Sequence, residues 1–266
     1  MEKPFYVQPL DKQKDKKEPG YIAKIPFSMY VVAQKGGGKS TTIIQLLKNP
    51  LKGKFNRIFW VSPTANLDEK IQLLKEERNL LAKNENLLAL LKRMKKKKTI
   101  MGDGLDIDYK TEMDSSDFKS KLDILFLQEI INEQKYIISE FGKKFADNIL
   151  IVFDDSVLDD ILKDKKFIEI LFQSRHYKLS FIIISQSYKA LAKKVRINTS
   201  QLLLYETGNS KELREIYEEN NNGVSFEKFM NFYQEAIKIP YNFLNINNDN
   251  FLNRRFISGF NKFLQE

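Results

Sequence analysis

The chain has 266 residues, a formal charge of +9, one histidine and no cysteine, and 42% of its residues are hydrophobic. The lack of cysteine excludes disulfides, thiolate metal sites and thiol catalysis, and a single histidine argues against a histidine metal centre. No apolar run reaches the roughly 20 residues of a membrane-spanning helix, so we expect no signal peptide and no membrane insertion. The basic charge favours polyanionic partners, nucleic acid first, although lysine also serves as plain solvated surface.

Two regions are expected along the chain. Residues 1–24 are predicted to form a partly flexible N-terminal arm, because residues 11–19 are almost all charged or polar. Residues 25–266 are predicted to form a single domain. Within it we expect an elaboration at about residues 63–147 and a helical, aromatic-rich C-terminal segment from about residue 210.

Short, almost wholly apolar segments alternate with segments of helical periodicity. Strands are expected at residues 25–33, 56–62, 148–153, 179–185 and 200–206. Helices are expected at residues 41–49, 67–98, 118–141 and 157–177, and again in the tail. Strands that are buried on both faces lose the alternation of polar and apolar residues. The pattern therefore predicts an α/β fold, with a mostly parallel sheet and helices on both of its faces.

A glycine-rich sequence, "AQKGGGKST" at residues 33–41, stands between the first strand and its helix. Three consecutive glycines let backbone N–H groups curl around a phosphate without Cβ clashes. An apolar strand before the loop and an amphipathic helix after it are the context that a phosphate-binding loop requires. The residues expected to bind the nucleotide are Gln34, Lys35, Gly36, Gly37, Gly38, Lys39, Ser40 and Thr41.

Three side chains at the end of this loop have distinct expected roles. Lys39 is placed to reach the β- and γ-phosphates, the Ser40 hydroxyl can ligate Mg²⁺, and Thr41 opens a helix whose dipole favours an anion. Ala33 stands where the usual pattern G-x-x-x-x-G-K-[ST] has its first glycine. Alanine is acceptable there if its φ stays negative. The alternative is a glycine-rich turn that binds nothing.

Paired carboxylates end the apolar segment "ILIVFDD" at residues 149–155. The carboxyl ends of the strands are where ligands bind in open α/β sheets. Asp154 is therefore expected to hold the Mg²⁺ shell, and Asp155 to act as the general base toward the attacking water. The alternative is that Asp155 or Ser156 merely caps the next helix.

Three further polar residues are candidates for the same reaction. Gln186 ends the apolar segment "FIIISQS" and could contact the γ-phosphate or the water, or else be an ordinary loop residue. Arg175 and Arg196 could each be an arginine finger supplied to a neighbouring subunit, or else a surface or DNA-phosphate arginine. His176, the only histidine, is expected to be structural.

Taken in order, five segments resemble the genome-packaging ATPases of large DNA viruses, poxvirus-type and virophage-type, of the FtsK–HerA branch of P-loop motors. The segments are "AQKGGGKST", "IFWVSPT", "ILIVFDDS", "QSRHYKLSFIIISQSYKAL" and "RINTSQLLLYE". With the tail segment "SFEKFMNFYQEA...PYNFL", the resemblance covers roughly residues 25–250. The run "SRHYKLSFIIISQSYKAL" is its most specific part, because generic P-loop proteins lack it.

The resemblance implies an additional-strand, RecA/FtsK-like core, in which the strand that ends at Gln186 lies between the other two site strands. It implies ATP and Mg²⁺ as cofactors, and a homo-oligomeric ring of five or six subunits that pumps double-stranded DNA into a capsid. It also implies a capsid vertex or portal-like partner, and a location in the host cytoplasm at the assembly site or in the virion. Lys39 and Ser40 match the Walker A pair, Asp154 and Asp155 the Walker B pair, and Gln186 the sensor. Arg175 and Arg196 match the family's two arginines.

Two departures from the family pattern stand out. Cellular relatives usually carry Glu where Asp155 stands, and residues 67–117 have no pattern that can be aligned. The basic run "KRMKKKK" at residues 92–98 is the candidate DNA contact, with a solvated helix end as the alternative.

Other functions remain as alternatives. These are another DNA-dependent P-loop ATPase, such as a helicase or a DNA-segregation pump, a small-molecule kinase, and a non-hydrolysing DNA clamp. A GTPase is disfavoured because no N-K-x-D sequence is present.

Overall fold

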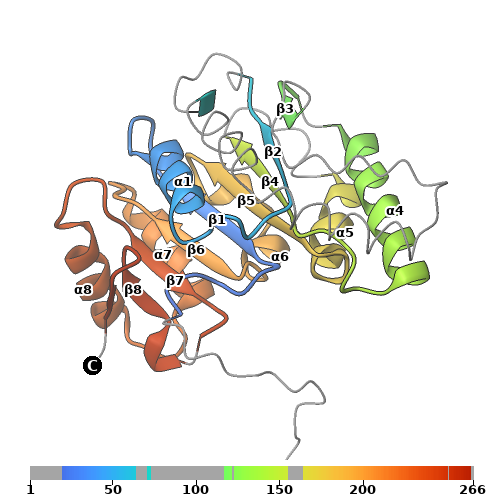
Figure 1. Ribbon diagram of the computed structural model, residues 1–266. Coiled ribbons are helices and arrows are strands. Elements are labelled where there is room, and N and C mark those ends of the chain that lie inside the picture. Colours follow the sequence, from blue (N-terminus) through green and yellow to red (C-terminus); the bar gives the residue numbers. More distant parts are fainter. Residues whose placement is uncertain are drawn as a thin grey trace, which may run out of the picture.

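The computed structural model describes residues 20–63, 71–72, 117–121, 123–154, 164–250 and 252–264. In these residues one nine-stranded sheet runs in the order β3-β2-β4-β5-β1-β6-β7-β8-β9 (Figure 1). Strands β1 to β6 pair in parallel, and β7, β8 and β9 continue the sheet in antiparallel pairing. The strands are β1 Ser28–Val32, β2 Arg57–Val61, β3 Phe118–Lys119, β4 Ile149–Asp154, β5 Leu179–Ser185, β6 Gln201–Leu204, β7 Leu244–Asn247, β8 Phe256–Ser258 and β9 Lys262–Phe263.

The centre of the sheet has the strand order that the resemblance implies. Strand β5 lies between β4 and β1 and pairs in parallel with both. In that register Val32 is the partner of Ser185, and Asp154 is the partner of Ile184. The additional-strand core and the mostly parallel α/β sheet are therefore confirmed, and the three strand ends that matter for the site meet at one edge.

Four of the six described helices begin at a polar side chain that caps them. The six helices in the described residues are α1 Lys39–Lys48, α4 Ile124–Phe141, α5 Lys165–Gln173, α6 Lys193–Arg196, α7 Ser210–Asn220 and α8 Phe226–Ile237. The side chains of Asp123, Asp164, Asn209 and Ser225 accept hydrogen bonds from first-turn N–H groups of α4, α5, α7 and α8. None of these helices is both long and apolar enough to cross a bilayer.

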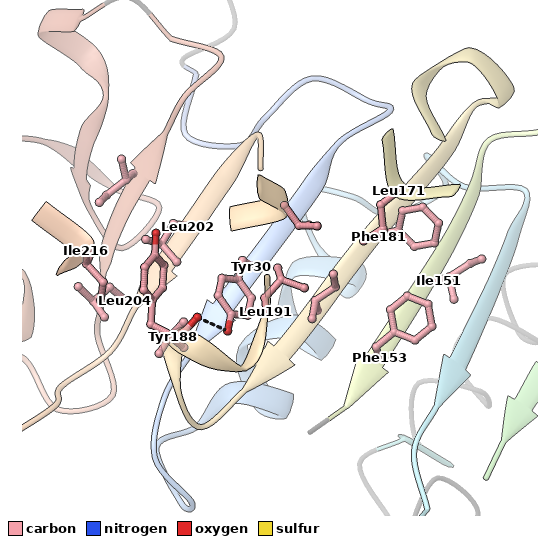
Figure 2. Packing of buried hydrophobic residues seen from close by; sticks show 14 of the residues in the cluster. Tyr30, Ile151, Phe153, Leu171, Phe181, Tyr188, Leu191, Leu202, Leu204 and Ile216 are labelled. Atoms are coloured by element: carbon pink, nitrogen blue, oxygen red, sulfur yellow. Dashed lines mark hydrogen bonds between the residues drawn. The ribbon is translucent and has the colours of Figure 1, made fainter. Parts of the chain in front are cut away.

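The parallel strands β1, β2, β4, β5 and β6 send alternate side chains to two apolar cores, one on each face of the sheet. On β1, Tyr30 and Val32 enter the core that α4, α5, α7 and α8 cover. Met29 and Val31 enter the other core, which α1 covers. Figure 2 shows the first core, where Phe153 of β4 stacks on Phe181 of β5 with ring centroids 5.7 Å apart. Helices therefore bury both faces of the parallel strands.

Two expected helices have different bounds. Residues 118–141 were predicted to be one helix, but Phe118–Lys119 pairs with β2 and the helix begins only after its cap, Asp123. Residues 157–177 were predicted to be another; Lys165–Gln173 is helical after its cap, Asp164, and a 3-10 turn, Ser174–Tyr177, ends the segment. Most of the predicted helix at 67–98 lies outside the described residues. Its Ile71 is fully buried in the core beneath α1.

The tail is helical only in part. Helices α7 and α8 lie within residues 210–237 as expected, but the strands β7, β8 and β9 follow them, so the predicted helical segment extends only to Ile237. Strand β7 has the sequence "LNIN", and its Asn245 and Asn247 are fully buried. Asn245 Nδ2 donates to Tyr21 O at 2.9 Å, and Asn247 Nδ2 donates to Gly20 O at 2.7 Å. Gly20 and Tyr21 of the predicted N-terminal arm are thus bound to β7.

Candidate active site

The loop after β1 has a backbone that only glycine adopts without strain at two positions. Gly36 and Gly38 have φ angles of 81° and 88°, in the left-handed region. Gly37 is restricted by space instead, because a Cβ there would lie 3.1 Å from Gln34 O and 3.3 Å from Ala33 Cβ. All three positions therefore favour glycine, two through their φ angles and one through the space around it.

Ala33 continues the strand rather than starting the turn. Its N–H donates to Ser185 O at 3.0 Å, which extends the pairing of β1 with β5 by one residue. Its φ is not positive, and its side chain is buried. The condition on which alanine was acceptable in place of the first glycine is therefore met.

The side chain of Lys39 folds back onto the loop that precedes it. Its Nζ donates to Ala33 O at 2.8 Å and to Gln34 O at 3.4 Å, and only 8% of the residue is exposed. Helix α1 starts at Lys39 rather than at Thr41, with Gly38 as a cap residue that has no side chain. Ser40 and Thr41 are half-buried in its first turn, while Gln34 and Lys35 are exposed. The ammonium group is thus held at the loop by two backbone carbonyls.

Two other predicted site residues lie at the same edge of the sheet. Asp154 is the last residue of β4, and Gln186 directly follows β5, which pairs with β1. Asp154 is half-buried and Gln186 is exposed. The phosphate-loop residues, Asp154 and Gln186 are therefore brought to one edge as expected. Asp155 and Ser156 lie outside the described residues.

The loop after Gln186 is held by hydrogen bonds from two elements. Tyr30 of β1 donates its hydroxyl to Ser187 O at 2.7 Å. The same hydroxyl also lies 3.1 Å from Tyr188 O, the hydrogen bond drawn between these two residues in Figure 2. Glu212 of α7 accepts from Tyr188 N at 2.8 Å and from Ser187 Oγ at 3.1 Å. Burial raises the pKa of the Tyr30 hydroxyl, so it stays a donor at neutral pH. The residues that follow Gln186 are therefore held in place by β1, the strand before the phosphate loop, and by α7.

Arg196 is buried among its own chain's residues. Its guanidinium pairs with Glu219 at 2.6 Å and with Glu215 at 2.9 Å, and it donates to Leu191 O at 2.9 Å. It also lies 4.5 Å from the centre of the Tyr188 ring. Only 5% of the Arg196 side chain is exposed. This environment is that of a structural ion pair, and the predicted finger role of Arg196 would require these bonds to open.

Arg175 lies at the opposite edge of the sheet from the phosphate loop. Its Nη2 donates to Ser200 Oγ at 2.6 Å and pairs with Asp249 at 3.2 Å. Ser200 Oγ in turn accepts from the backbone N–H of Ser28, the first residue of β1. At a rise of about 3.3 Å per residue, that end of β1 is roughly 16 Å from Ala33. The Arg175 side chain is 53% exposed, and it lies far from the phosphate loop of its own chain.

Sequence reasoning missed three residues around this site. Tyr205, after β6, donates its hydroxyl to Thr42 Oγ1 at 2.7 Å and so supports the first turn of α1; burial raises its pKa to about 12. Glu212 holds the loop after Gln186 from α7. Tyr241 lies against Gly38, because a Cβ built on Gly38 would be 3.4 Å from its ring. Only tertiary contacts bring these residues to the loop, since each lies far from it in the chain.

The family model described as Poxvirus A32 protein matches residues 111–256, which is more than half of the chain. The chain belongs to the poxvirus A32 protein family. The predicted resemblance to poxvirus-type packaging ATPases is thereby confirmed. A search of curated proteins found no significant match.

The structure of this A32 family member is also similar to several solved structures. The genome packaging NTPase B204 from Sulfolobus turreted icosahedral virus 2, in complex with AMP, is 17% identical over 84% of this chain and 93% of its own, with a TM-score of 0.51. B204 from Sulfolobus turreted icosahedral virus, described as a DNA-packaging ATPase, is 17% identical over 85% and 94%, with a TM-score of 0.46. VirB4 of Thermoanaerobacter pseudethanolicus is 13% identical over 84% and 87%, with a TM-score of 0.44. The first of these similarities shows a shared fold.

Proposed function

We propose that this A32 family member is an ATP-driven motor that moves double-stranded DNA into a viral capsid. One observation carries the proposal: a loop shaped for phosphates, a carboxylate and an amide converge at the carboxyl edge of β1, β4 and β5. That edge is where open α/β sheets bind their ligands. Family membership supports the packaging role, as does the fold shared with B204, a genome packaging NTPase.

The described residues fit a nucleotide and its metal ion. Gly36 and Gly38 give the loop the left-handed backbone that lets N–H groups surround an anion, and Lys39 brings a positive charge within hydrogen-bond reach of the loop. The Ser40 hydroxyl and the Asp154 carboxylate are hard oxygen ligands, which Mg²⁺ prefers. When bound, Mg²⁺ would neutralise charge that develops on the transferred phosphoryl group.

Hydrolysis needs a water molecule positioned and deprotonated beside the γ-phosphate. We assign deprotonation to Asp155 and orientation of the water to Gln186. Gln186 follows β5 directly, and its loop is bonded to Tyr30 and Glu212, so a change at the γ-phosphate would reach α7 through few contacts. This arrangement suits a residue that reports hydrolysis to the rest of the subunit.

A neighbouring subunit would supply the arginine that completes the site. Arg175 is the better of the two predicted fingers, because it is 53% exposed and lies away from its own phosphate loop. Arg196 would have to leave a buried ion pair with Glu219. We therefore propose a ring of five or six subunits in which Arg175 of one subunit reaches the nucleotide of the next.

DNA is proposed to contact the basic run at residues 92–98, which lies outside the described residues. Replacing Lys95, Lys96, Lys97 and Lys98 with Ala should lower DNA-stimulated hydrolysis and leave basal hydrolysis unchanged, because phosphate contacts by lysine release counterions. A variant with Lys165→Ala and Lys166→Ala, two exposed positions at the start of α5, is the charge-removal control. Equal stimulation in the quadruple variant and in the wild type would refute the assignment.

The proposal is tested by ATP hydrolysis and particle size in the presence of duplex DNA. We expect hydrolysis to rise with duplex DNA, and a ring-sized particle with an ATP analogue. Absence of hydrolysis, or a monomer under all conditions, would overturn the motor. Unwinding of forked DNA would instead favour a helicase.

Mixing experiments identify the finger. Arg175→Ala subunits mixed with Lys39→Ala subunits should regain part of the activity, because an interface at which a Lys39→Ala subunit supplies its arginine to the loop of an Arg175→Ala subunit is intact. Recovery with Arg196→Ala subunits and none with Arg175→Ala subunits would reverse the assignment. A capsid vertex or portal-like partner, and action at the host's cytoplasmic assembly site, belong to the same proposal.

A further inference from the structure

The connection between α8 and β7 contains a turn that has tyrosine where glycine is expected. The backbone N–H of Asn242 donates to Ile239 O at 3.1 Å, which closes a four-residue turn over Pro240 and Tyr241. Proline at the second position and a positive φ at the third are features of a type II turn, whose third residue is normally glycine or asparagine. Here Tyr241 has a φ of 64°. The protein therefore accepts backbone strain to place an aromatic ring at this point.

The strained ring is directed away from the core. Tyr241 is 72% exposed, the largest value among the exposed large hydrophobic residues in the described part of the chain. Burial within the subunit therefore does not account for the strain. A strained and exposed aromatic residue is a candidate for ligand contact.

The turn is held in place by its neighbours. Asn242 Nδ2 donates to Ala236 O at 2.7 Å and to Ser258 Oγ at 2.9 Å, which joins the turn to the end of α8 and to β8. The ring of Phe243, the next residue, packs on that of Tyr205 with centroids 4.9 Å apart. Tyr205 in turn is bonded to Thr42 in the first turn of α1. The position of Tyr241 relative to the phosphate loop is thus determined by packed and hydrogen-bonded contacts on both sides.

The ring lies directly against the residue that precedes Lys39. A Cβ built on Gly38 would meet Tyr241 Cδ1 at 3.4 Å and Tyr241 Cβ at 3.6 Å. Gly38 is the cap residue of α1, from which the first-turn N–H groups of the helix extend. An aromatic face therefore borders the place where we propose that phosphates bind.

We propose that Tyr241 is the stacking platform for the base of the bound nucleotide. The assignment rests on the proposed function, because it requires a nucleotide whose phosphates lie in the loop of residues 33–41. The loop would hold the phosphates by N–H groups and by Lys39, and the base would lie against the tyrosine ring. The strained backbone keeps the ring at the loop before the ligand arrives, so little side-chain freedom is lost on binding.

Stacking on a ring face contributes affinity rather than base identity, since every base has a π-face. The larger purines offer more contact area than pyrimidines. ATP and GTP should therefore bind with similar affinity, and CTP and UTP more weakly.

The test compares a nucleotide with its phosphates alone. ATP and inorganic tripolyphosphate, each with Mg²⁺, are titrated into the full chain by calorimetry. Tyr241→Gly should weaken ATP binding about tenfold and leave tripolyphosphate binding unchanged, because only the base loses its partner. Tyr241→Phe and Tyr241→Trp keep a ring and should bind ATP within about twofold of wild type. Tyr136→Ala, at a half-exposed tyrosine of α4, is the matched control and should change neither ligand.

A folding defect can be told apart from lost stacking. Tyr241→Gly relieves the positive φ, so its unfolding temperature should be equal to or higher than that of the wild type. Unchanged ATP binding in Tyr241→Gly, or an equal loss of tripolyphosphate binding, would overturn the platform. Lys39→Ala should weaken both ligands; if it weakens neither, the proposed nucleotide site fails, whatever Tyr241 does.

Discussion

The parallel strands β1, β4 and β5 and the antiparallel strand β7 are all buried, but by different means. Residues 149–153 and 179–185 are apolar apart from two serines, and helices cover both of their faces. Strand β7 alternates apolar residues with Asn245 and Asn247, whose amides bond to the N-terminal segment and to the neighbouring strands. A strand can thus be buried either by hydrophobic packing or by complete hydrogen bonding.

The difference separates two tasks in the molecule. The parallel part brings the ends of β1, β4 and β5 to one edge, where the chemistry is proposed. The antiparallel part begins after Tyr241. It holds the turn at Pro240 and Tyr241 against the phosphate loop, and Asn247 of β7 bonds to the backbone of Gly20. Mutations in the first part should mainly affect turnover, and those in the second part should mainly affect stability or affinity.

The largest effect is expected at the carboxyl edge of the parallel part. Asp155→Asn should retain ATP binding and lose about 10²- to 10⁴-fold in turnover, because the general base is removed. Lys39→Ala should abolish tight ATP binding. Binding by calorimetry and turnover by phosphate release measure the two effects separately. Asp164→Asn is the control, because asparagine still caps α5, and it should change neither ATP binding nor turnover. Normal turnover in Asp155→Asn would refute the role of Asp155 as general base.

Arg196 should be the most sensitive stability position near the site. Arg196→Met leaves Glu219 buried without its main partner and should lower the free energy of unfolding by about 3–5 kcal/mol. Lys193→Met is the control, because Lys193 is 72% exposed and 4.0 Å from the same carboxylate; it should cost less than about 1 kcal/mol. Urea unfolding measures both variants. An Arg196→Met protein of wild-type stability would favour the finger role for Arg196.

The same ion pair predicts a pH dependence. Burial alone would raise the pKa of Glu219, but Arg196 and Tyr188 hold it below its ordinary value of 4.5. A carboxyl group with a lowered folded-state pKa stabilises the protein above the unfolded-state pKa and loses this effect on acidification. Without Arg196, burial should raise the pKa of Glu219 in the variant, so the variant is relieved when this carboxyl takes up a proton above pH 4.5. Below about pH 4.5 the wild type loses the contribution of its ion pair, so the stability difference between wild type and Arg196→Met should shrink throughout acidification. A difference that is independent of pH down to pH 3 would contradict this account.

The antiparallel part should show a smaller effect of a different kind. Asn245→Ala removes partners from Tyr21 O, Gly259 O and the Gln201 amide, so it should destabilise the protein by about 1–3 kcal/mol without changing turnover per folded molecule. Asn261→Ala, at an exposed position of the last hairpin, is the control and should be close to neutral. Thermal unfolding together with specific activity separates the two effects.

Sequence patterns predicted the parallel part better than the antiparallel part for a physical reason. Apolar runs such as residues 149–153 and 179–185 can only be buried strands when helical segments flank them, so local composition was enough. In β7 the asparagines look like loop residues, because their partners at Gly20, Tyr21 and Gln201 are distant in the chain. The helix expected at 118–141 was too long at its start, since the pairing of residues 118–119 with β2 is also a tertiary contact.

The candidate site likewise contains residues that local sequence predicts and residues that only tertiary contacts place. The phosphate loop was visible in the sequence because its function requires glycines, lysine and serine at consecutive positions, and Asp154 and Gln186 because each ends an apolar run. That Ala33 could replace the first glycine depended on its φ, which only the structure reveals. The burial of Arg196, the remote position of Arg175 and the approach of Tyr241 to Gly38 were likewise decided by tertiary structure. Local sequence determines the conformation of a loop and the end of a strand, whereas the partners of a side chain depend on which distant segments the fold brings together.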